Sequence, residues 1–383
     1  VTILESNEKI GKKLFITGKG RCNITNNCTN DEFLKNVVTN NKFLYNALNN
    51  FSTNDTINFF NSYGPLLKIE RGNRVFPESD KSSDIIKTFS KLLKKDNVTL
   101  YLNTLVKDVI KKEDIFEVKT MQGNIIGDAV VIATGGKSYS STGSKGDGYR
   151  FAKQLNHTIV TPIPALIPIN IKNYDGSLAG LSLKNISASI NINGKKFSQF
   201  GEMLFTHKGI SGPIVLTLSS YINKYNIKGK DIIIDLKPAL SYEQLNDRII
   251  RDSFTNKNKS LKNYLKELLP LSLVDFFIKV GNFNPDCKMC NLGKETRKDI
   301  VKCLKNLIFK VDKLEDIEYA IVTSGGVNIK EVNPKNMESK IVKNLFFVGE
   351  VLDIDALTGG FNIQIALSTG FSAGSYLKNY TKV

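Results

Sequence analysis

The sequence predicts an α/β fold built on a parallel sheet, and three stretches of the chain support this class. Residues 128–136, DAVVIATGG, and residues 344–353, NLFFVGEVLD, each place a short apolar run before glycine. A continuous apolar run is typical of a strand buried on both faces, as in parallel sheets. Residues 358–377, TGGFNIQIALSTGFSAGSYL, begin with a glycine pair and continue with the pattern of a helix.

Composition places the chain among globular proteins. Its 383 residues exceed what one compact domain usually holds, so the length predicts two or three subdomains. Hydrophobic residues make up 41% of the chain, and no run of 18 apolar residues predicts a membrane span. Five cysteines, an odd number, fit a reducing compartment. We therefore expect a soluble, cytoplasmic protein without a membrane partner.

The formal net charge of +16 raises the hypothesis of a nucleic-acid partner, because a basic surface concentrates phosphates. The lysines are, however, spread over the whole chain and interleaved with asparagines, a pattern that an AT-rich genome also produces. We find no localised stretch of basic and aromatic residues of the kind on which single strands stack. Nucleic acid is therefore the less favoured partner and is kept as an alternative.

Cys287 and Cys290 form a C-x-x-C motif that would suit zinc or a redox dithiol. A zinc site needs a second such pair or nearby histidines. Only Cys303 follows, and the two histidines, His157 and His207, lie far away in the sequence. We expect a loop with free thiols and no metal.

Periodicity divides the rest of the chain into segments of different character. Residues 31–97 have a mainly helical pattern, interrupted by a hairpin signal around Gly72 and Asn73. Residues 98–127, with VTLYLN, LVKDVIKK and IFEVKT, predict a small antiparallel meander. Residues 159–240 are rich in strand-like segments, but Pro213, ahead of an apolar run, predicts a helix start that Ser211 or Gly212 would cap. Residues 242–309 are helical and charged, and the leucines at helical spacing in residues 261–269 are expected in the core.

Three predicted strand ends should meet at one edge of the sheet. Glu5 ends an early strand, a glycine turn at Gly135 ends a middle strand, and a helix starts near Gly360 after a late strand. A dinucleotide-bound flavin needs these three features: an acid for the ribose, glycine turns for the pyrophosphate, and a helix N-terminus for the flavin ring. The combination predicts FAD as cofactor.

One part of the expected nucleotide site is not in the sequence. A G-x-G-x-x-G turn normally precedes the acidic residue by about 20 residues, yet Glu5 is the fifth residue of a chain that begins with valine. We interpret the sequence as trimmed at its start. Without that strand, the sheet should be split and the pyrophosphate left uncradled.

Four blocks of the chain resemble a known family. They are ILESNEKIGKKLFITGKGRCNITN, VVIATGGKSYSSTGSKGDGYRFAKQLNH, GEMLFTHKGISGPIVLTLS, and the stretch from VTSGGVNIKEVNP through GEVLDIDALTGGFN to STGFSAG. Their order and spacing are similar to those of bacterial FAD-binding flavoproteins of the aminoacetone oxidase-like family, which also includes a reductase of a bile-acid dehydroxylation pathway. The resemblance implies a Rossmann-like FAD-binding domain of the glutathione-reductase-like superfamily, with an inserted β-barrel-like domain and a helical subdomain.

The resemblance also implies domain boundaries and site residues. The domains would be residues 1–160 and 319–383 for FAD binding, 161–240 for the β-rich insertion, and 241–318 for the helical subdomain. Carried over by motif, Glu5 would hold the ribose, Lys13 would lie near the adenosine phosphate side, and Val106 would meet the adenine. The adenosine end would be lined by Ala133, Thr134 and Gly135, and the flavin half would be passed by Gly20, Arg21, Cys22 and Asn23. The ribityl chain and ring would be lined by Gly349, Glu350, Gly360, Asn362 and Ile363.

The predicted function is an FAD-dependent oxidoreductase that acts on a small molecule by hydride transfer at flavin N5, with NAD(P)H as the electron donor. No second G-x-G-x-x-G unit follows a strand, so a separate nicotinamide-binding domain is not expected. One alternative is an oxygen-using amine oxidase of the aminoacetone oxidase type. An alternative of another class is a flavin-containing RNA-modifying or nucleic-acid-binding protein, which the charge motivates.

The catalytic residues are not identified by the sequence. His207 is a weak candidate because histidine can move protons near neutral pH. We favour the interpretation that it caps a turn or bonds to main chain, since acid–base work has to be argued from geometry.

Overall fold

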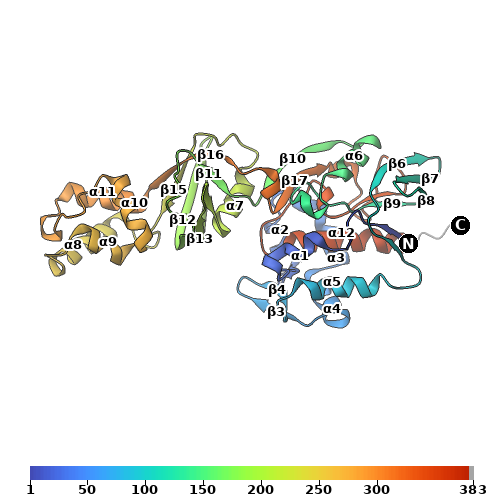
Figure 1. Ribbon diagram of the computed structural model, residues 1–383, viewed down its shortest axis with the longest axis horizontal. Coiled ribbons are helices and arrows are strands. Elements are labelled where there is room, and N and C mark those ends of the chain that lie inside the picture. The colour runs from blue at the N-terminus through green and yellow to red at the C-terminus, as the bar shows by residue number, and fades with distance from the viewer. Residues whose placement is uncertain (379–383) are drawn as a thin grey trace. The chain divides into compact units, whose positions relative to one another are not determined.

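The structure is a computed structural model that describes residues 1–378. The chain divides into two compact units, which are described separately here. Unit 1 consists of Val1–Ala165 with Asp316–Val383, and unit 2 is Leu166–Glu315. The predicted α/β class with an inserted barrel is confirmed, as Figure 1 shows. The four-part domain division stays a prediction.

The parallel strands of unit 1 form two separate pairs. β1 (Thr2–Leu4) pairs with β5 (Thr99–Tyr101), and β9 (Val130–Ile132) pairs with β18 (Leu345–Phe347). Within the described residues no strand joins β1 to β9.

The meander of unit 1 differs from its sequence prediction in one of its segments. β6 (Val106–Lys112), β7 (Ile115–Thr120) and β8 (Asn124–Gly127) pair in antiparallel order. The segment VTLYLN does not belong to it, and that part of the prediction was wrong. The segment forms β5 instead, because its backbone groups pair with β1 in a parallel register, Ile3 beside Leu100.

Burial of the parallel strands is uneven. All three residues of β18 are buried, as predicted. In β9, Val131 remains 42% exposed, and in β1 no residue is fully buried. The expectation of a strand buried on both faces was therefore wrong for β9, because Val130 and Ile132 pack on one face while Val131, on the other, stays exposed.

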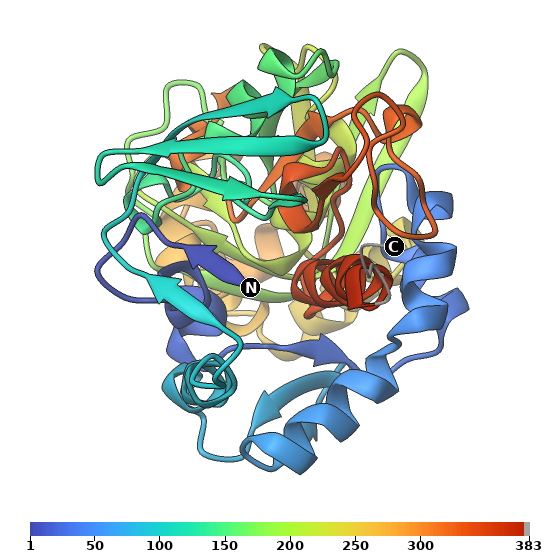
Figure 2. The same ribbon diagram turned by 90° about the vertical axis from the view of Figure 1, so that its right-hand side faces the viewer.

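The other elements of unit 1 surround these strands. Figure 2 looks nearly along α12, the long red helix. The predicted hairpin is confirmed by β3 and β4, with left-handed φ values of 77° at Gly72 and 57° at Asn73. The remaining bounds are α1 (Lys12–Ile16), η1 (Thr17–Gly20), β2 (Thr25–Asn26), α2 (Asn30–Lys35), η2 (Asn41–Leu44), α3 (Tyr45–Asn50), α4 (Thr53–Tyr63), β3 (Leu67–Glu70), β4 (Arg74–Pro77), α5 (Ser82–Leu92), η3 (Ser140–Thr142), α6 (Asp147–Gln154), β10 (Ile159–Ala165), η5 (Ile317–Tyr319), β17 (Val322–Val327), η6 (Ile329–Glu331), η7 (Gly349–Val351) and α12 (Phe361–Lys378).

Unit 2 contains a closed six-stranded barrel. The strands, in their order around the barrel, are β11 (Ile169–Ile171), β14 (Gly209–Ser211), β13 (Lys195–Phe205), β12 (Ser182–Ile192), β15 (Asp231–Asp235) and β16 (Leu307–Leu314). The helical prediction for residues 307–309 was wrong, because Leu307 and Phe309 alternate with exposed residues and fill the barrel core as part of β16.

Five helices complete unit 2. α7 (Pro213–Ile222) starts at Gly212 with proline in its first turn, as the sequence predicted. α8 (Tyr242–Thr255), α9 (Leu261–Leu268), α10 (Leu271–Gly281) and α11 (Lys294–Lys305) follow, with η4 (Met289–Asn291) before α11. The leucines predicted as core are buried, for example Leu261 and Leu265. Across residues 1–378, no helix is both long enough and apolar enough to span a membrane.

The buried His157 of unit 1 gives a pH-dependent prediction. Its ring lies 2.7 Å from Ser339 Oγ through Nε2 and packs against Phe347. Burial lowers the pKa of His157 below its ordinary value of 6.5. The unfolded chain therefore takes up a proton at a higher pH than the folded chain, so stability is present above the ordinary pKa and is lost as the pH falls toward the folded pKa.

We expect the melting temperature of His157→Gln to fall less between pH 7.5 and 5.5 than that of His207→Gln. His207 is the matched control because it is the second histidine of the chain and is exposed. Differential scanning fluorimetry across this pH range measures the difference. An equal change of melting temperature with pH in the two variants would contradict a lowered pKa of His157 in the folded protein.

Candidate functional site

A half-buried ion pair joins two predicted site residues that are 337 positions apart in the chain. Lys13 Nζ lies 2.6 Å from Glu350 Oε2 and donates to Ser138 Oγ at 2.8 Å. Ser138 Oγ donates to Glu350 Oε1 at 3.1 Å, and the backbone N–H of Thr323 donates to the same oxygen at 2.9 Å. We call these four residues the Lys13–Glu350 cluster. It links α1, η7, β17 and the turn after β9.

The glycine turn after β9 lies against this cluster. Gly135 has a left-handed φ of 73°. A Cβ on Gly136 would lie 2.6 Å from Thr323 Oγ1 and 3.0 Å from the Glu350 carboxyl carbon. The backbone therefore comes closer to the cluster than a side chain would allow, which is the physical reason for glycine here. The structure thus brings Lys13, Gly135 and Glu350 together.

The acidic residue after β1 is held by a local turn. Glu5 Oε1 accepts hydrogen bonds from Asn7 N at 2.9 Å and from Asn7 Nδ2 at 2.8 Å. Asn7 Nδ2 also donates to the carbonyl oxygen of Thr142 at 3.1 Å, which fixes Glu5 beside the segment that follows the glycine turn. The half-buried Glu5 carboxylate is thus oriented at the end of its strand, where an acid that grips a ribose is expected.

Residues 18–23 follow an unusual backbone path. Gly18, Lys19, Gly20 and Cys22 all have left-handed φ values, between 57° and 83°. Cys22 is fully buried in a cluster with Ile24, Phe60, Val75 and Ile85, against which Ile363 of α12 also packs. Asn23 Oδ1 accepts a hydrogen bond from the Val75 N–H at 3.2 Å.

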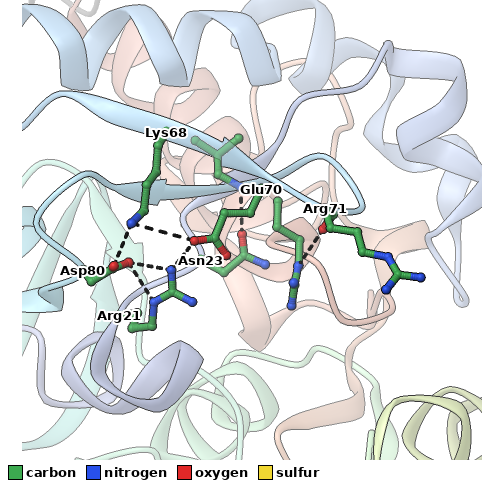
Figure 3. A network of polar contacts seen from close by, with 8 residues as sticks. Arg21, Asn23, Lys68, Glu70, Arg71 and Asp80 are labelled. Carbon is green, nitrogen blue, oxygen red and sulfur yellow. Dashed lines mark hydrogen bonds and ion pairs between the residues drawn. The ribbon is translucent and has the colours of Figure 1, made fainter. Parts of the chain in front are cut away.

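Arg21 is the centre of the charged network drawn in Figure 3. Its guanidinium pairs with Glu70 and lies 2.5 Å from Asp80 Oδ1, while Lys68 Nζ lies 2.6 Å from Asp80 Oδ2. The hydrogen bond from Arg21 holds the pKa of Glu70 below its ordinary value, and Lys68 and then Arg21 do the same for the pKa of Asp80. The guanidinium also stacks over the Phe76 ring, 4.1 Å from its centroid. Arg21 therefore ties residues 18–23 to the β3–β4 hairpin.

The start of α12 is packed directly against β2. Gly360 has a φ of 95°, and a Cβ there would lie 2.3 Å from the Thr25 carbonyl oxygen. Asn26 Nδ2 donates to the Gly359 carbonyl oxygen at 3.1 Å. Ile363 also packs against the apolar cluster that contains Cys22, so the segment around residues 22–26 lies beside residues 359–363.

Gln364 was not singled out by the sequence analysis, although it is the most connected side chain of α12. Its Oε1 accepts from Thr25 Oγ1 at 2.6 Å and from Thr56 Oγ1 at 2.8 Å, and its Nε2 donates to the Phe51 carbonyl and to Ser368 Oγ. The residue is fully buried. A glutamine on the buried face of an otherwise apolar helix start was the available signal, because buried polar groups are nearly always paired.

Ser138 and Thr323 were also missed, and no motif in the sequence marks them.

The remaining predicted residues differ in exposure and in the hydrogen bonds of their side chains. Asn362 uses its side-chain amide to bond the preceding loop: it accepts from the Ala356 N–H at 3.0 Å and donates to the carbonyl oxygens of Ala356 at 2.8 Å and Leu357 at 3.4 Å. His207 is exposed in the turn between β13 and β14 of unit 2. Ala133 and Thr134 are exposed and follow β9. Val106 is half-buried at the start of β6, and Gly349 lies at the start of η7.

The cysteines are free thiols in the structure. Burial raises the pKa of Cys22 to about 11 and that of Cys28 to about 11, so both stay protonated near neutral pH. The described residues hold no group of three or more His, Cys, Asp or Glu side chains that could bind a metal ion.

Glycine turns and a helix start at the carboxyl ends of parallel strands, beside a half-buried charge pair, are the arrangement of a nucleotide-binding α/β protein of the Rossmann type. A family model described as HI0933-like protein Rossmann domain matches residues 1–376. The chain belongs to that family.

Two curated relatives match almost the whole chain. It is 29% identical over 382 residues to a 3-dehydro-bile acid delta(4,6)-reductase of Clostridium scindens, with 98% of this chain and 91% of that protein covered. It is 30% identical over 383 residues to a ribosomal RNA dihydrouridine synthase of Escherichia coli, with 98% and 92% covered. Among solved structures, a flavocytochrome c3 fumarate reductase in its open conformation matches with a TM-score of 0.44 and 17% identity, over 97% of this chain and 70% of that chain. The predicted flavoprotein family and the prediction of an oxidoreductase are confirmed.

Two glycines allow a test of the packing between α12 and β2. Gly72→Ala places a side chain at a left-handed position with open space around it, so we expect a loss of about 1–2 kcal/mol in the free energy of unfolding. Gly360→Ala meets the same backbone strain and also the main chain of Thr25, so we expect a loss of about 3 kcal/mol or more. Urea denaturation measures both values. Equal losses would show that Gly360 is not required by close packing.

The Lys13–Glu350 pair can be tested by a double-mutant cycle of Lys13→Met and Glu350→Gln. The two side chains are only 24% and 18% exposed, so their attraction is partly shielded from water. We expect a coupling free energy of about 1–3 kcal/mol from the denaturation of the four proteins. A coupling below about 0.5 kcal/mol would mean that the pair does not hold α1 to η7.

Proposed function

We propose that this protein is an FAD-dependent reductase that saturates a carbon–carbon double bond of its substrate and receives its electrons from NAD(P)H. The observation that carries this proposal is the Lys13–Glu350 cluster, which gathers α1, the glycine turn after β9 and η7 in one place. These are the elements that an α/β sheet uses to hold a dinucleotide.

The residues of unit 1 fit the proposed FAD. Gly136 and Gly360 lie where a Cβ would collide with the protein's own atoms, so they allow the close packing that fixes the turn after β9 and the start of α12. The hydroxyl of Tyr149 is buried with no hydrogen-bond partner among the described residues. Burial, and then the nearby Glu350 and Asp353, raise the pKa of Tyr149, so its hydroxyl keeps the proton and is available as a donor.

Each part of the cofactor has candidate partners in the chain. Glu5 would hold the adenosine ribose, and Lys13 would add positive charge beside the phosphates. Gly135 would let the backbone pass the adenosine end, and the first N–H groups of α12, from Phe361 to Ile363, would donate to the flavin ring. The sequence contains no G-x-G-x-x-G turn for the pyrophosphate, so this part of the site has no assigned partner.

Bound FAD would supply two-electron chemistry, taking hydride from a nicotinamide and giving it to a substrate carbon. The chain contributes orientation and charge. The half-buried Glu350, fixed by Lys13, Ser138 and Thr323, keeps the cluster rigid, and the Arg21 network holds the segment 20–23, in which Gly20 and Cys22 have left-handed φ values. Rigid elements of this kind hold a cofactor in one orientation.

The kind of reaction is supported by the two relatives. By its name, a delta(4,6)-reductase removes carbon–carbon double bonds, and a dihydrouridine synthase adds two hydrogens to uridine. The shared chemistry is the saturation of a double bond in a ring system that also carries carbonyl groups. Our first substrate class is therefore a small unsaturated carbonyl compound.

The second candidate substrate is a uridine within ribosomal RNA. It is favoured by the net charge of +16, which would draw a polyanionic substrate to the protein, and by the relative from Escherichia coli. The two candidates share the cofactor and the reaction and differ in the size and charge of the substrate.

The test starts with an absorbance spectrum of the purified protein, followed by anaerobic titration with NADPH and NADH. We expect a flavin spectrum that bleaches with one of the two donors and recovers on addition of an unsaturated ketone or of a ribosomal RNA transcript. Lys13→Met should retain less flavin than wild type, whereas Gly180→Ala, at an exposed left-handed glycine of unit 2 with open space around it, should retain as much.

Two results would contradict the proposal. Absence of a flavin spectrum would exclude the cofactor. Rapid peroxide production with an amine in air, without reduction of either unsaturated substrate, would favour the amine oxidase of the aminoacetone oxidase type.

A further inference from the structure

We propose that one end of the barrel of unit 2 binds the phosphate backbone of RNA. We name this end the basic tip and define it by Lys195, Lys196, Tyr225, Lys228 and Lys230. The inference rests on the RNA candidate of the proposed function and goes beyond it, because it assigns RNA contact to a surface outside the proposed FAD-binding residues of unit 1.

The basic tip is made by two segments that are separated in the sequence. Lys195 and Lys196 follow the tight turn between β12 and β13, where Asn193 and Gly194 have left-handed φ values of 50° and 80°. Residues 223–230 connect α7 to β15. The rings of Phe197 and Tyr225 lie 5.7 Å apart between centroids, so the connection packs beside the hairpin.

Strand register sets how close the lysines lie. In the barrel, β12 has β13 on one side and β15 on the other, with Ile192 opposite Lys195 and Ile190 opposite Ile232. Two strands that flank a third are about 10 Å apart. Lys230, directly before β15, therefore lies about two strand spacings from Lys195, at the same end of the barrel.

The positive charges of the tip are not neutralised within unit 2. The side chains of Lys195, Lys196, Lys228 and Lys230 are exposed and form no ion pair with any residue from 1 to 378. The neighbouring acid, Asp231, is already paired with Lys310 at 3.3 Å. Four unpaired lysines at one barrel end form a site that attracts a chain of phosphates.

An aromatic ring lies among these lysines. Tyr225 is 39% exposed, and the half-buried Phe197 supports it from one side, while Lys195 Nζ lies 5.0 Å from the centroid of Phe197. Lysines beside an exposed ring are the combination that holds single-stranded nucleic acid, because the lysines contact phosphates and a base stacks on the ring. The linear sequence did not reveal this patch, since its two halves come together only when the barrel closes.

The composition of the tip favours RNA over an anionic membrane. Its aliphatic residues, Ile192 and Ile227, are 2% and 5% exposed, so none of them is available to insert among lipid chains. Peripheral membrane binding needs such exposed apolar side chains in addition to lysines. The tip offers an aromatic face and positive charge without them.

The experiment compares two adjacent pairs of exposed lysines. Lys195→Ala with Lys196→Ala removes two charges from the tip, and Lys94→Ala with Lys95→Ala removes two exposed charges from unit 1 as the matched control. Binding of the full-length protein to a fluorescent fragment of ribosomal RNA is followed by anisotropy from 50 to 300 mM salt. Each phosphate contact contributes about 0.7 to the slope of log affinity against log salt for a single strand.

We expect the tip variant to bind at least about tenfold more weakly at low salt, with a slope reduced by about 1.4, and the control to bind like wild type. Tyr225→Ala should weaken binding by about fivefold or more without changing the slope, because it removes stacking and no charge. The NADPH-dependent bleaching of the flavin should be the same in all variants.

Three results would overturn the inference. The first is an equal loss of RNA affinity in the tip and control variants. The second is a wild-type protein that reduces a small substrate but does not bind RNA. The third is a tip variant that loses binding to phosphatidylserine vesicles while keeping its affinity for RNA. In each case normal bleaching of the flavin would leave the proposed reductase function in place. Loss of the flavin spectrum in wild type would instead refute the proposed function.

Discussion

The ion pair between Lys13 and Glu350 is the constraint on which the arrangement of unit 1 depends. Its partners come from opposite ends of the chain, and Ser138 and Thr323 add contacts from two further segments. Partial burial makes each hydrogen bond costly to lose, because the group left behind would lack both water and a partner. The glycine turn, η7 and α1 are therefore fixed relative to one another by side-chain chemistry, in a region where β1 and β9 share no backbone hydrogen bonds.

The second organising element is the polar interior under α12. Helices usually bury an apolar stripe, but α12 directs Gln364 and several hydroxyl-bearing residues inward. Gln364 bonds with β2, α4 and the chain before α4 at the same time. A fully satisfied polar network specifies one orientation of the helix more strictly than apolar packing does. It thereby defines where the first N–H groups of α12 point.

Sequence reasoning was successful where chemistry is local. Glycine after an apolar run identified the turn at Gly135, and proline after Gly212 identified the start of α7. It failed where the outcome depends on partners distant in the chain. The segment at residues 99–101 has the pattern of a meander strand, yet it pairs with β1 in a parallel register. Ser138, Thr323 and Gln364 could not be recognised as bonding residues, because a serine, a threonine or a glutamine has no distinctive spacing until its partners are known.

The chain leaves unit 1 and returns to it at two paired strands, and this affects how the inserted unit 2 can be replaced. The chain leaves through β10 and returns shortly before β17, and these two strands pair in antiparallel fashion with Ala165 opposite Val322. The inserted 166–315 segment therefore begins directly after this ladder and ends seven residues before it, so both of its ends are anchored by one pair of strands. Exchange of this whole segment for another, or its replacement by a short linker, leaves every hydrogen bond of that ladder intact. Evolution could therefore alter what the inserted unit recognises without rebuilding the unit proposed to carry the cofactor.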